Sequence, residues 1–484
     1  MIADRFEQLV LLVQGQRISS DLIWTEVIPL VPAFFVLALV ADYGYMIYLH
    51  FKMASLPKKH THLLPPSKPW IYFEALSQKY NSPIITFWTG RRPTIWLNDA
   101  WTASDLLDKR AAIYASRPRM VVFVELGAGQ SNLVNMYYGN RWRLHRKITH
   151  MGVGLQERVG SYMDPIITEV IAVMQRAAEL NVSGRRFPMA MESFPRGQGR
   201  GRPFFYALAE EAANNPTLAA SDSYARKLFT EAAKHNLTRM EISSLAGNLF
   251  GAGNDTSSST LVTFALACCA FPETLPAAWE ELDRAVGPHR SPDFEDQDEL
   301  HYVRAFVKEV FRWRSVAVIG GQPHAPVRDD WDKGYFIPKA TWIQGNVWAI
   351  HHNTRDFPEP DRFNPSRFLP NSPDARPFPG EKGYMTFGWR RRVCSGQGLA
   401  EQGTFITIAR LLWGFRIERA LDEGGEGNGL NMRPNPFKCR ITPRSDEIRE
   451  TIEREGMQAL RDLAKYDGET KYRMSTYYKE EEKL

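Results

Sequence analysis

One cysteine near the end of the chain stands in a setting that suits chemistry. The stretch FGWRRRVCSG, Phe387–Gly396, places Cys394 after three arginines and between glycines. Cationic side chains and backbone amides lower the pKa of a thiol, so Arg390, Arg391 and Arg392 predict a thiolate here. A thiolate serves as a nucleophile, a zinc ligand or a ligand of haem iron. For this stretch taken alone, a buried structural cysteine is the alternative.

Two of these roles lack partners in the sequence. The next cysteine, Cys439, lies 45 residues on, and the nearest upstream histidine is His352, so neither has the spacing of a zinc site. A nucleophile needs a histidine base, and no residue near Cys394 supplies one. Ligation of haem iron remains, because a proximal thiolate donates electron density that favours O–O cleavage.

A second stretch combines an acid and an alcohol inside a helical pattern. SSLAGNLFGAGNDTSSSTLVTFALACC, Ser243–Cys269, is apolar at helical spacing, but its middle holds two glycines followed by Asp255 and Thr256. Glycine costs about 1 kcal/mol in a helix interior, and threonine bonds back to the preceding turn. We therefore expect a kink or π-bulge at this point, with Asp255 and Thr256 as a proton relay. A polar contact between helices is the alternative.

A third stretch predicts a buried ion pair. In KEVFRWR, Glu309 and Arg312 are three residues apart and share one helix face. Most such pairs are solvated and nearly neutral in energy, but apolar residues surround this one. A buried pair needs further partners, and Arg367 in FPEPDRFNPSRFLP offers a planar guanidinium suited to a carboxylate.

Taken in order, these stretches resemble the cytochrome P-450 superfamily of haem-thiolate monooxygenases. The matching patterns are Gly-x-Asp-Thr, Glu-x-x-Arg, Pro-x-Arg-Phe and Phe-…-Arg-x-Cys-x-Gly, and the run from Gly320 to His351 resembles the microsomal fungal branch of secondary metabolism. The resemblance covers about Pro65 to Pro443. It implies a mainly α fold with a small β-sheet region behind an N-terminal membrane anchor. It also implies insertion of one oxygen atom from O2 into a lipophilic small molecule.

The resemblance assigns roles residue by residue. Cys394 would be the axial thiolate ligand of haem b iron, and Asp255 and Thr256 would deliver protons to bound dioxygen. Glu309, Arg312 and Arg367 match a structural triad that locks the fold around the haem. The remaining matches would contact the haem propionates through charge-assisted bonds: Trp142, Arg146, His324, Arg392 and, more weakly, Arg117.

Electrons must come from another protein, because the sequence has no nicotinamide or flavin motif. The resemblance implies NADPH–cytochrome P-450 reductase, an acidic flavoprotein. A basic docking face would attract it, formed by Arg141, Arg143, Arg146, Lys147 and Arg390–Arg392; a solvated charge cluster is the alternative. Two other functions stay open: a haem-thiolate isomerase or dehydratase, and a non-catalytic degenerate paralogue.

The last alternative rests on departures from the family pattern. Arg390 stands where relatives usually have a glycine that lets the loop turn, and Ala340 replaces another common glycine. Only 110 positions separate Arg146 from Thr256, several tens fewer than in relatives. The shortening falls between the C-helix and I-helix regions. Two junctions, Gly152–Pro165 and Met191–Pro203, are abrupt, so we expect missing helices behind the haem and over the substrate pocket.

The N-terminal segment predicts how these elements are anchored. Residues 27–49 are apolar with one charge, Asp42, which is enough for one spanning helix. Lysines follow it at positions 52, 58 and 59, so we expect the catalytic domain in the cytosol and the anchor in the endoplasmic reticulum membrane. A cleaved signal peptide and a buried core helix are the alternatives.

The predicted order is a lumenal segment 1–26, an anchor 27–49, a proline-rich linker 50–70, a catalytic domain 71–444 and a charged tail 445–484. Within the domain we expect a helix at Ile71–Tyr80, a hairpin at Pro83–Asn98, helices up to about Trp313 and strands over Gly334–His351. The tail alternates charges and predicts a solvated helix.

Composition agrees with this plan. The chain has 484 residues and is 44% apolar, enough for a large core. Its four cysteines are too few for a disulfide framework, and Cys268 and Cys269 have the setting of core residues in a reducing compartment. A net charge of +5 without a basic tail gives no reason to expect nucleic acid as a partner.

Overall fold

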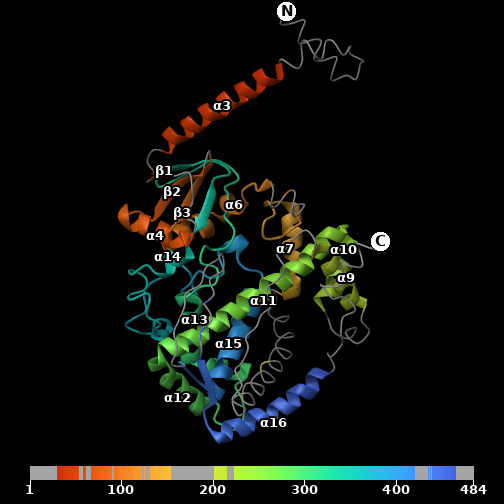
Figure 1. Ribbon diagram of the computed structural model, residues 1–484, viewed down its shortest axis with the longest axis vertical. Helices are drawn as coiled ribbons and strands as arrows, with labels where there is room; N and C mark the ends of the chain where they lie inside the picture. Colours follow the sequence, from red (N-terminus) through yellow and green to blue (C-terminus); the bar gives the residue numbers. More distant parts are fainter. Residues whose placement is uncertain are drawn as a thin grey trace, which may run out of the picture. The chain divides into compact units, whose positions relative to one another are not determined.

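The structure is a computed structural model, and Figure 1 shows it as a ribbon. It describes residues 30–53, 58–60, 67–89, 92–121, 125, 131–153, 170, 201–214, 223–419, 434, 437 and 439–464. The chain divides into two compact units. The first comprises Met1–Leu56 and Asp330–Pro338, and the second comprises Pro57–Asp329 and Lys339–Leu484. Each unit is described by itself.

The first unit consists of an apolar helix and a short hairpin. Helix α3 (Leu30–Lys52) leaves Phe34 to Tyr48 mostly exposed. Among the described residues, it is the one helix that by itself is long and apolar enough to cross a membrane. The hairpin joins β4 (Asp330–Asp332) to β5 (Tyr335–Ile337), and the Lys52 amine lies 4.2 Å from the centre of the Phe336 ring. The prediction of one apolar helix near the N-terminus as a candidate anchor is therefore confirmed, with Pro32–Lys52 as the candidate span.

In the second unit, a four-stranded sheet has the order β1-β2-β3-β6. The strands are β1 (Lys58–His60), β2 (Ile84–Thr89), β3 (Arg92–Leu97) and β6 (Trp342–Gly345). Strands β2 and β3 are antiparallel in the register Ile84↔Leu97, which confirms the predicted hairpin, whereas β6 runs parallel to β3. Helix α4 (Pro69–Lys79) packs on this sheet, where Phe73 stacks on Trp96 with ring centres 4.0 Å apart.

The strand prediction for Gly334–His351 is wrong at its end. After β6, the chain enters helix α14 (Val347–His351), because the Asn346 side chain accepts a hydrogen bond from the Ala349 amide and caps the first turn. The other sheet of the second unit is an antiparallel pair, β7 (Phe415–Arg419) and β8 (Cys439–Pro443).

The largest hydrophobic core lies among helices of the C-terminal half (Figure 1). These are α11 (Arg239–Ala270), α12 (Leu275–Ala285), α13 (His301–Trp313), α15 (Gln397–Gly414) and α16 (Asp446–Leu463). Cys268 is fully buried in this core, as expected, and all four cysteines are free. Helix α16 was expected to be solvated throughout, but Ile448 and Ile452 are buried in the same core. The amphipathic spacing of its apolar residues explains the difference.

Short elements connect these parts. They are α5 (Ala100–Ala103), π-helix η2 (Ser104–Lys109), α6 (Ala111–Tyr114), η4 (Pro272–Thr274), η5 (Phe294–Asp298), η6 (Pro365–Phe368) and η7 (Arg390–Arg392). The π-helix η2 lies against η7, next to the loop that carries Cys394.

Three helices pack around the first half of α11, in the region where the chain is short. They are α7 (Asn140–Val153), α9 (Gly201–Asn214) and α10 (Tyr224–His235), with Ile148, Leu228 and Leu245 in their shared core. A Cβ on Gly247 would lie 2.8 Å from the Phe205 ring, so glycine is what allows α9 to approach α11. The predicted junctions lie outside the described residues, except for Gly152, Val153 and 201–203.

One carboxylate ties α7 to the start of α11. Glu241 accepts hydrogen bonds from Arg141, whose Nε lies 2.5 Å from Oε1 and whose Nη2 lies 2.6 Å from Oε2. The Nε2 atom of buried His145 lies 3.0 Å from the same Oε1. It also forms a capping box with Thr238. Burial of the carboxylate opposes its ionisation, but the hydrogen bonds from Arg141, Thr238 and His145 outweigh burial and lower the pKa of Glu241 to about 2.

We predict that Glu241→Gln lowers the free energy of unfolding by roughly 2–3 kcal/mol at neutral pH. Because the pKa falls on folding, the carboxylate stabilises the protein above its ordinary value of 4.5 and loses this effect as the pH falls towards about 2. Denaturation of both proteins across this pH range should show curves that converge in acid. The exposed Glu450→Gln serves as control, and parallel curves for wild type and Glu241→Gln would contradict the prediction.

Candidate functional site

The Cys394 loop lies directly before the N-terminus of α15. The Cys394 amide donates to the Phe387 carbonyl at 2.9 Å, which closes the loop. The residue is exposed. The largest effect on the pKa of its thiol is nevertheless partial desolvation by the surrounding protein, which raises it. The Gly396 amide and the charge of Arg146 act in the opposite direction without overcoming this. The predicted lowering of the pKa by three neighbouring arginines is therefore wrong for the protein alone.

The reason is where the arginines point. The Arg392 guanidinium turns away and donates to the carbonyls of Ala115 at 2.6 Å and Met136 at 2.7 Å. Arg391 donates to the Tyr138 hydroxyl, and Arg390 is exposed. Of the cations among the described residues, Arg146 from α7 is the one whose charge lowers the pKa of the thiol, and its Nη1 donates to the Ser395 hydroxyl at 2.5 Å. The cation beside Cys394 thus comes from a helix far away in sequence.

Both departures from the family's glycines adopt the left-handed conformation. Arg390 has a φ of 36° and Ala340 a φ of 63°. A side chain in this region costs about 1–2 kcal/mol relative to glycine. Burial raises the pKa of the Asp108 carboxyl of η2, and the backbone amide and the charge of Arg390 act in the opposite direction. Arg390 therefore carries the cost of its left-handed conformation, and the attraction of its charge to Asp108 offsets part of that cost.

A tryptophan that the sequence did not single out holds the loop in place. Trp389 is almost fully buried, and its ring occupies the space where a Cβ on Gly345 or Gly320 would lie, at 2.1 and 2.7 Å. Its Nε1 donates to the Met385 sulfur at 3.3 Å. The adjacent glycines at 320 and 321, both with positive φ, are the signal that pointed to this close approach.

Two of the predicted propionate-binding arginines, buried Arg117 and half-buried Arg392, have no carboxylate partner among the described residues. Arg117 donates to the carbonyls of Val134, Gln322 and Pro323, and burial lowers its pKa to about 9. Burial, together with the charges of Arg117 and Arg146, lowers the pKa of Arg392 to about 8. Within the described part of the chain, no acidic side chain forms an ion pair with Arg117 or Arg392. Their positive charges are close enough to repel each other.

The other predicted contacts gather around these two arginines. His324 is buried, its Nδ1 lies 2.9 Å from the Tyr114 carbonyl, and burial with the charges of Arg117 and Arg392 lowers its pKa well below its usual range. Trp142 is buried, with the Arg392 guanidinium 4.3 Å from the centre of its ring. The structure therefore brings Arg117, Arg146, His324, Arg392 and Trp142 to one region beside the Cys394 loop.

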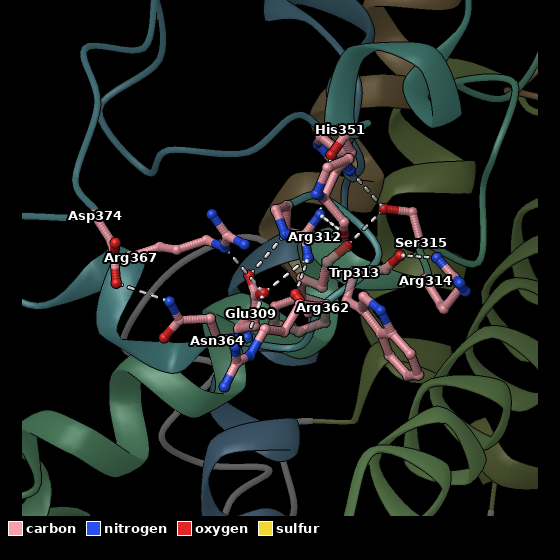
Figure 2. Close-up of polar contacts among 12 residues, drawn as sticks. Glu309, Arg312, Trp313, Arg314, Ser315, His351, Arg362, Asn364, Arg367 and Asp374 are labelled. Carbon is pink, nitrogen blue, oxygen red and sulfur yellow. Dashed lines mark hydrogen bonds and ion pairs between the residues drawn. The ribbon is translucent and has the colours of Figure 1, made fainter. Parts of the chain in front are cut away.

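The predicted triad is also assembled, as Figure 2 shows. Arg312 donates to Glu309 through Nε and Nη2, both at 2.7 Å, and neither side chain is exposed. The Arg367 Nε lies 3.5 Å from Glu309, and the Asn364 amide donates to the same carboxylate at 2.9 Å. Arg312 also donates to the carbonyls of His351 and Pro360. The expectation of a buried pair with further partners is correct.

The predicted acid–alcohol pair lies on α11. Thr256 donates its hydroxyl to the Ala252 carbonyl at 2.6 Å, the expected bond to the preceding turn, and Asp255 is exposed. The predicted π-bulge is wrong, because α11 is a regular α-helix from Arg239 to Ala270. A Cβ on Gly251 or Gly253 would meet open space, so these glycines leave a bare helix surface beside the pair.

The predicted basic docking face is smaller than the sequence indicated. Arg141 is neutralised by Glu241, and Arg146 and Arg392 point inward as described above. The exposed cations that remain are Arg143, Lys147, Arg390 and Arg391. Arg143 and Arg391 both lie over the Tyr138 ring, with guanidinium carbons 5.4 and 5.2 Å from its centre, which places α7 beside the Cys394 loop on this face.

Comparison with known proteins identifies relatives over most of the chain. A family model described as Cytochrome P450 matches residues 57–190 and 208–438. A cytochrome P450 monooxygenase of Armillaria gallica is 31% identical, over 80% of this chain and 88% of the relative. Cytochrome P450 monooxygenase 58 of Postia placenta is 32% identical, over 79% of this chain and 86% of the relative. The second predicted junction, Met191–Pro203, falls between the two matched segments.

Solved structures agree in fold. A zebrafish cytochrome P450 solved with progesterone superposes with a TM-score of 0.60, at 22% identity, covering 78% of this chain and 100% of that chain. This likeness supports the mainly helical architecture with small sheets.

We predict that Gly345→Ala displaces Trp389 and lowers the free energy of unfolding by about 1–3 kcal/mol. The added Cβ would lie 2.1 Å from the buried ring, which has no free space to move into. Thermal unfolding should show the loss. Gly403→Ala in α15 is the control, because a Cβ there meets open space and alanine favours the helix. Equal stability of Gly345→Ala and wild type would contradict the role of Trp389.

We further predict that Ala340→Gly raises the free energy of unfolding by roughly 0.5–1 kcal/mol, because it removes left-handed strain. Arg390→Gly should gain less, since it also removes the positive charge beside Asp108. Ala233→Gly, at an exposed position inside helix α10, should lose about 1 kcal/mol and controls for the general effect of glycine. A loss of stability in Ala340→Gly would refute the strain argument.

Proposed function

The chain belongs to the cytochrome P450 family and is a monooxygenase, and we propose that it acts in fungal-type secondary metabolism on a lipophilic small molecule. We further propose Cys394 as the axial thiolate ligand of its haem iron, and NADPH–cytochrome P-450 reductase as its electron donor. Family membership implies a haem-iron cofactor and a redox partner. The substrate, the donor and the role of each residue are inferences from the site.

One observation carries the assignment of the site. Buried Arg117 and half-buried Arg392 repel each other, donate to backbone carbonyls and have no acidic partner among the described residues, next to a loop that presents a cysteine. Buried charges are costly unless a counter-charge meets them. Haem b carries two propionates, and bidentate or charge-assisted bonds to arginine are the strong form of carboxylate binding. The donor set therefore fits a haem whose carboxylates face Arg117 and Arg392.

The remaining residues supply binding and positioning. Haem provides the activation of dioxygen when bound. Cys394 would hold the iron, and Arg146, fixed on Ser395, would favour the thiolate by its charge. His324 keeps Nδ1–H on the Tyr114 carbonyl, which leaves Nε2 for a contact with the cofactor. Trp142 would hold the Arg392 guanidinium over its ring.

Asp255 and Thr256 are proposed to move protons that the chemistry of a bound haem would consume. The Thr256 O–H is engaged by the Ala252 carbonyl, so its oxygen lone pairs are the part available to accept a hydrogen bond. Delivery of a proton from this hydroxyl then requires release of the Ala252 bond, with Asp255 as the exposed carboxyl that restores the proton from solvent. This pair supports oxygen activation over isomerase or dehydratase chemistry, which uses no external electrons and does not require such a pair.

The membrane and the electron donor are proposed from two surfaces. Helix α3 supports a single-pass anchor in the endoplasmic reticulum, with the catalytic domain in the cytosol. Arg143, Lys147, Arg390 and Arg391 are exposed on α7 and the Cys394 loop and would attract an acidic partner. Reductase-supported turnover should therefore weaken as salt concentration rises.

We predict that the full-length protein, reduced with dithionite and bound to carbon monoxide in detergent, has the strongly red-shifted Soret band of thiolate ligation. Cys394→Ser should lose this band, and Cys439→Ser, which removes a cysteine of β8, should retain it. A wild-type band at the position of thiol or imidazole ligation, or the absence of haem, would reject the proposed site and favour a degenerate paralogue.

A further inference from the structure

A buried histidine connects the Glu309–Arg312 pair with the loop of the proposed iron ligand. His351, at the end of α14, is 1% exposed. Its backbone carbonyl accepts a hydrogen bond from Arg312 at 3.0 Å, so the ion pair fixes the position of the residue (Figure 2). The run Gly320–His351 that carries the family resemblance ends on this histidine, but the resemblance assigned it no role.

The ring of His351 contacts two different segments. Its Nε2 lies 2.9 Å from the backbone nitrogen of Met385, and its Nδ1 lies 3.0 Å from the Ser315 hydroxyl. The Met385 amide can only donate, so Nε2 must be the unprotonated nitrogen and Nδ1 must carry the hydrogen. The hydroxyls of Ser315 and Thr386 both donate to the Phe311 carbonyl, at 2.5 and 2.7 Å, and lie 3.0 Å apart. Every polar atom of the ring therefore has a partner.

Met385 begins the turn that leads to Cys394. Its carbonyl accepts the Gly388 amide at 3.1 Å, and the Phe387 carbonyl between them accepts the Cys394 amide at 2.9 Å. The same residue presents its sulfur to the Trp389 indole. A shift of the Met385 backbone would therefore move both the acceptor of the Cys394 amide and the aromatic wedge of the loop.

We propose that His351 is a positioning residue for Cys394, acting as a neutral acceptor that fixes the Met385 amide and so transmits the rigid position of the Glu309–Arg312 pair to the ligand loop. This inference rests on the proposed role of Cys394. Its active atom is Nε2; the Met385 amide, which can only donate, sets the tautomer, and the Ser315 hydroxyl accepts the hydrogen on Nδ1. The amide side chains of glutamine and asparagine separate these two functions, because they resemble the Nε2 and Nδ1 ends of imidazole respectively.

The test uses the full-length protein in detergent with His351→Gln and His351→Asn. Glutamine places its Oε1 where it can accept the Met385 amide, so His351→Gln should keep the red-shifted ferrous–carbon monoxide band. Asparagine cannot reach Met385, and an unsatisfied buried amide should speed conversion of that band to the shorter-wavelength form by about tenfold. Hydrogen exchange of the peptide containing Met385, measured by mass spectrometry, should be faster in His351→Asn alone.

Controls separate this role from general stability and from failure of the proposed site. His289→Asn changes a surface histidine, and Ser315→Ala removes the Nδ1 partner but leaves the Met385 bond; both should keep the band. Equal band loss in His351→Gln and His351→Asn would overturn the inference, as would a His351→Asn protein with unchanged band and exchange. If His351→Asn does not fold, loss of the band in His351→Gln decides against the inference, and its retention with slow Met385 exchange supports it. A wild-type protein without the band would instead reject Cys394 itself.

Discussion

The second unit of the structure depends on one buried carboxylate. Glu309 has no contact with water, and desolvation of an ion pair is tolerated only where hydrogen bonds meet every charged atom. Arg312 and the Asn364 amide supply those bonds, and Arg367 adds a second positive charge. The segments that carry these donors are thereby held to α13. Because a missing donor would leave a buried charge, the arrangement has little freedom to relax, and neighbouring loops can be positioned from it.

The loop of Cys394 is positioned from several sides at once. The Trp389 ring fills the space left by Gly345, the Arg392 guanidinium binds carbonyls around Leu133 and Met136, and Met385 is bonded to His351. The first contact is steric packing, the second is a set of hydrogen bonds from a charged group, and the third is a hydrogen bond between neutral groups. Each restrains a different part of the loop. The positive charges of Arg117 and Arg392 beside this loop have no acidic partner among the described residues. An anionic cofactor that binds these charges in the folded protein alone would raise the free energy of unfolding, so that binding and folding are linked.

The departures from the family pattern are local costs that the fold accommodates. Arg390 and Ala340 occupy conformations that glycine adopts without strain. The charge of Arg390 is attracted to the Asp108 carboxyl, and Ala340 lies in an exposed turn. Among the described residues between α7 and α11, α9 and α10 pack on α11, and the Glu241 ion pair ties α7 to the start of α11. These contacts give the chain a way to hold α7, and with it Arg146, beside the Cys394 loop.

The sequence by itself determined the family, the main helices, the β2–β3 hairpin and the burial of Glu309 with Arg312, because these follow from spacing along a few turns or from ordered motifs. It predicted a lowered thiol pKa at Cys394, which was wrong, and a basic face that is smaller in the structure than the sequence indicated. Side-chain direction decides such properties: Arg392 turns to distant carbonyls, and Arg141 meets Glu241. The roles of Trp389, Asp108 and His351 likewise came only from the tertiary structure, since each depends on atoms from segments that the fold brings together. Electrostatic and steric energies depend on the distance between those atoms in space and not on their separation in the sequence.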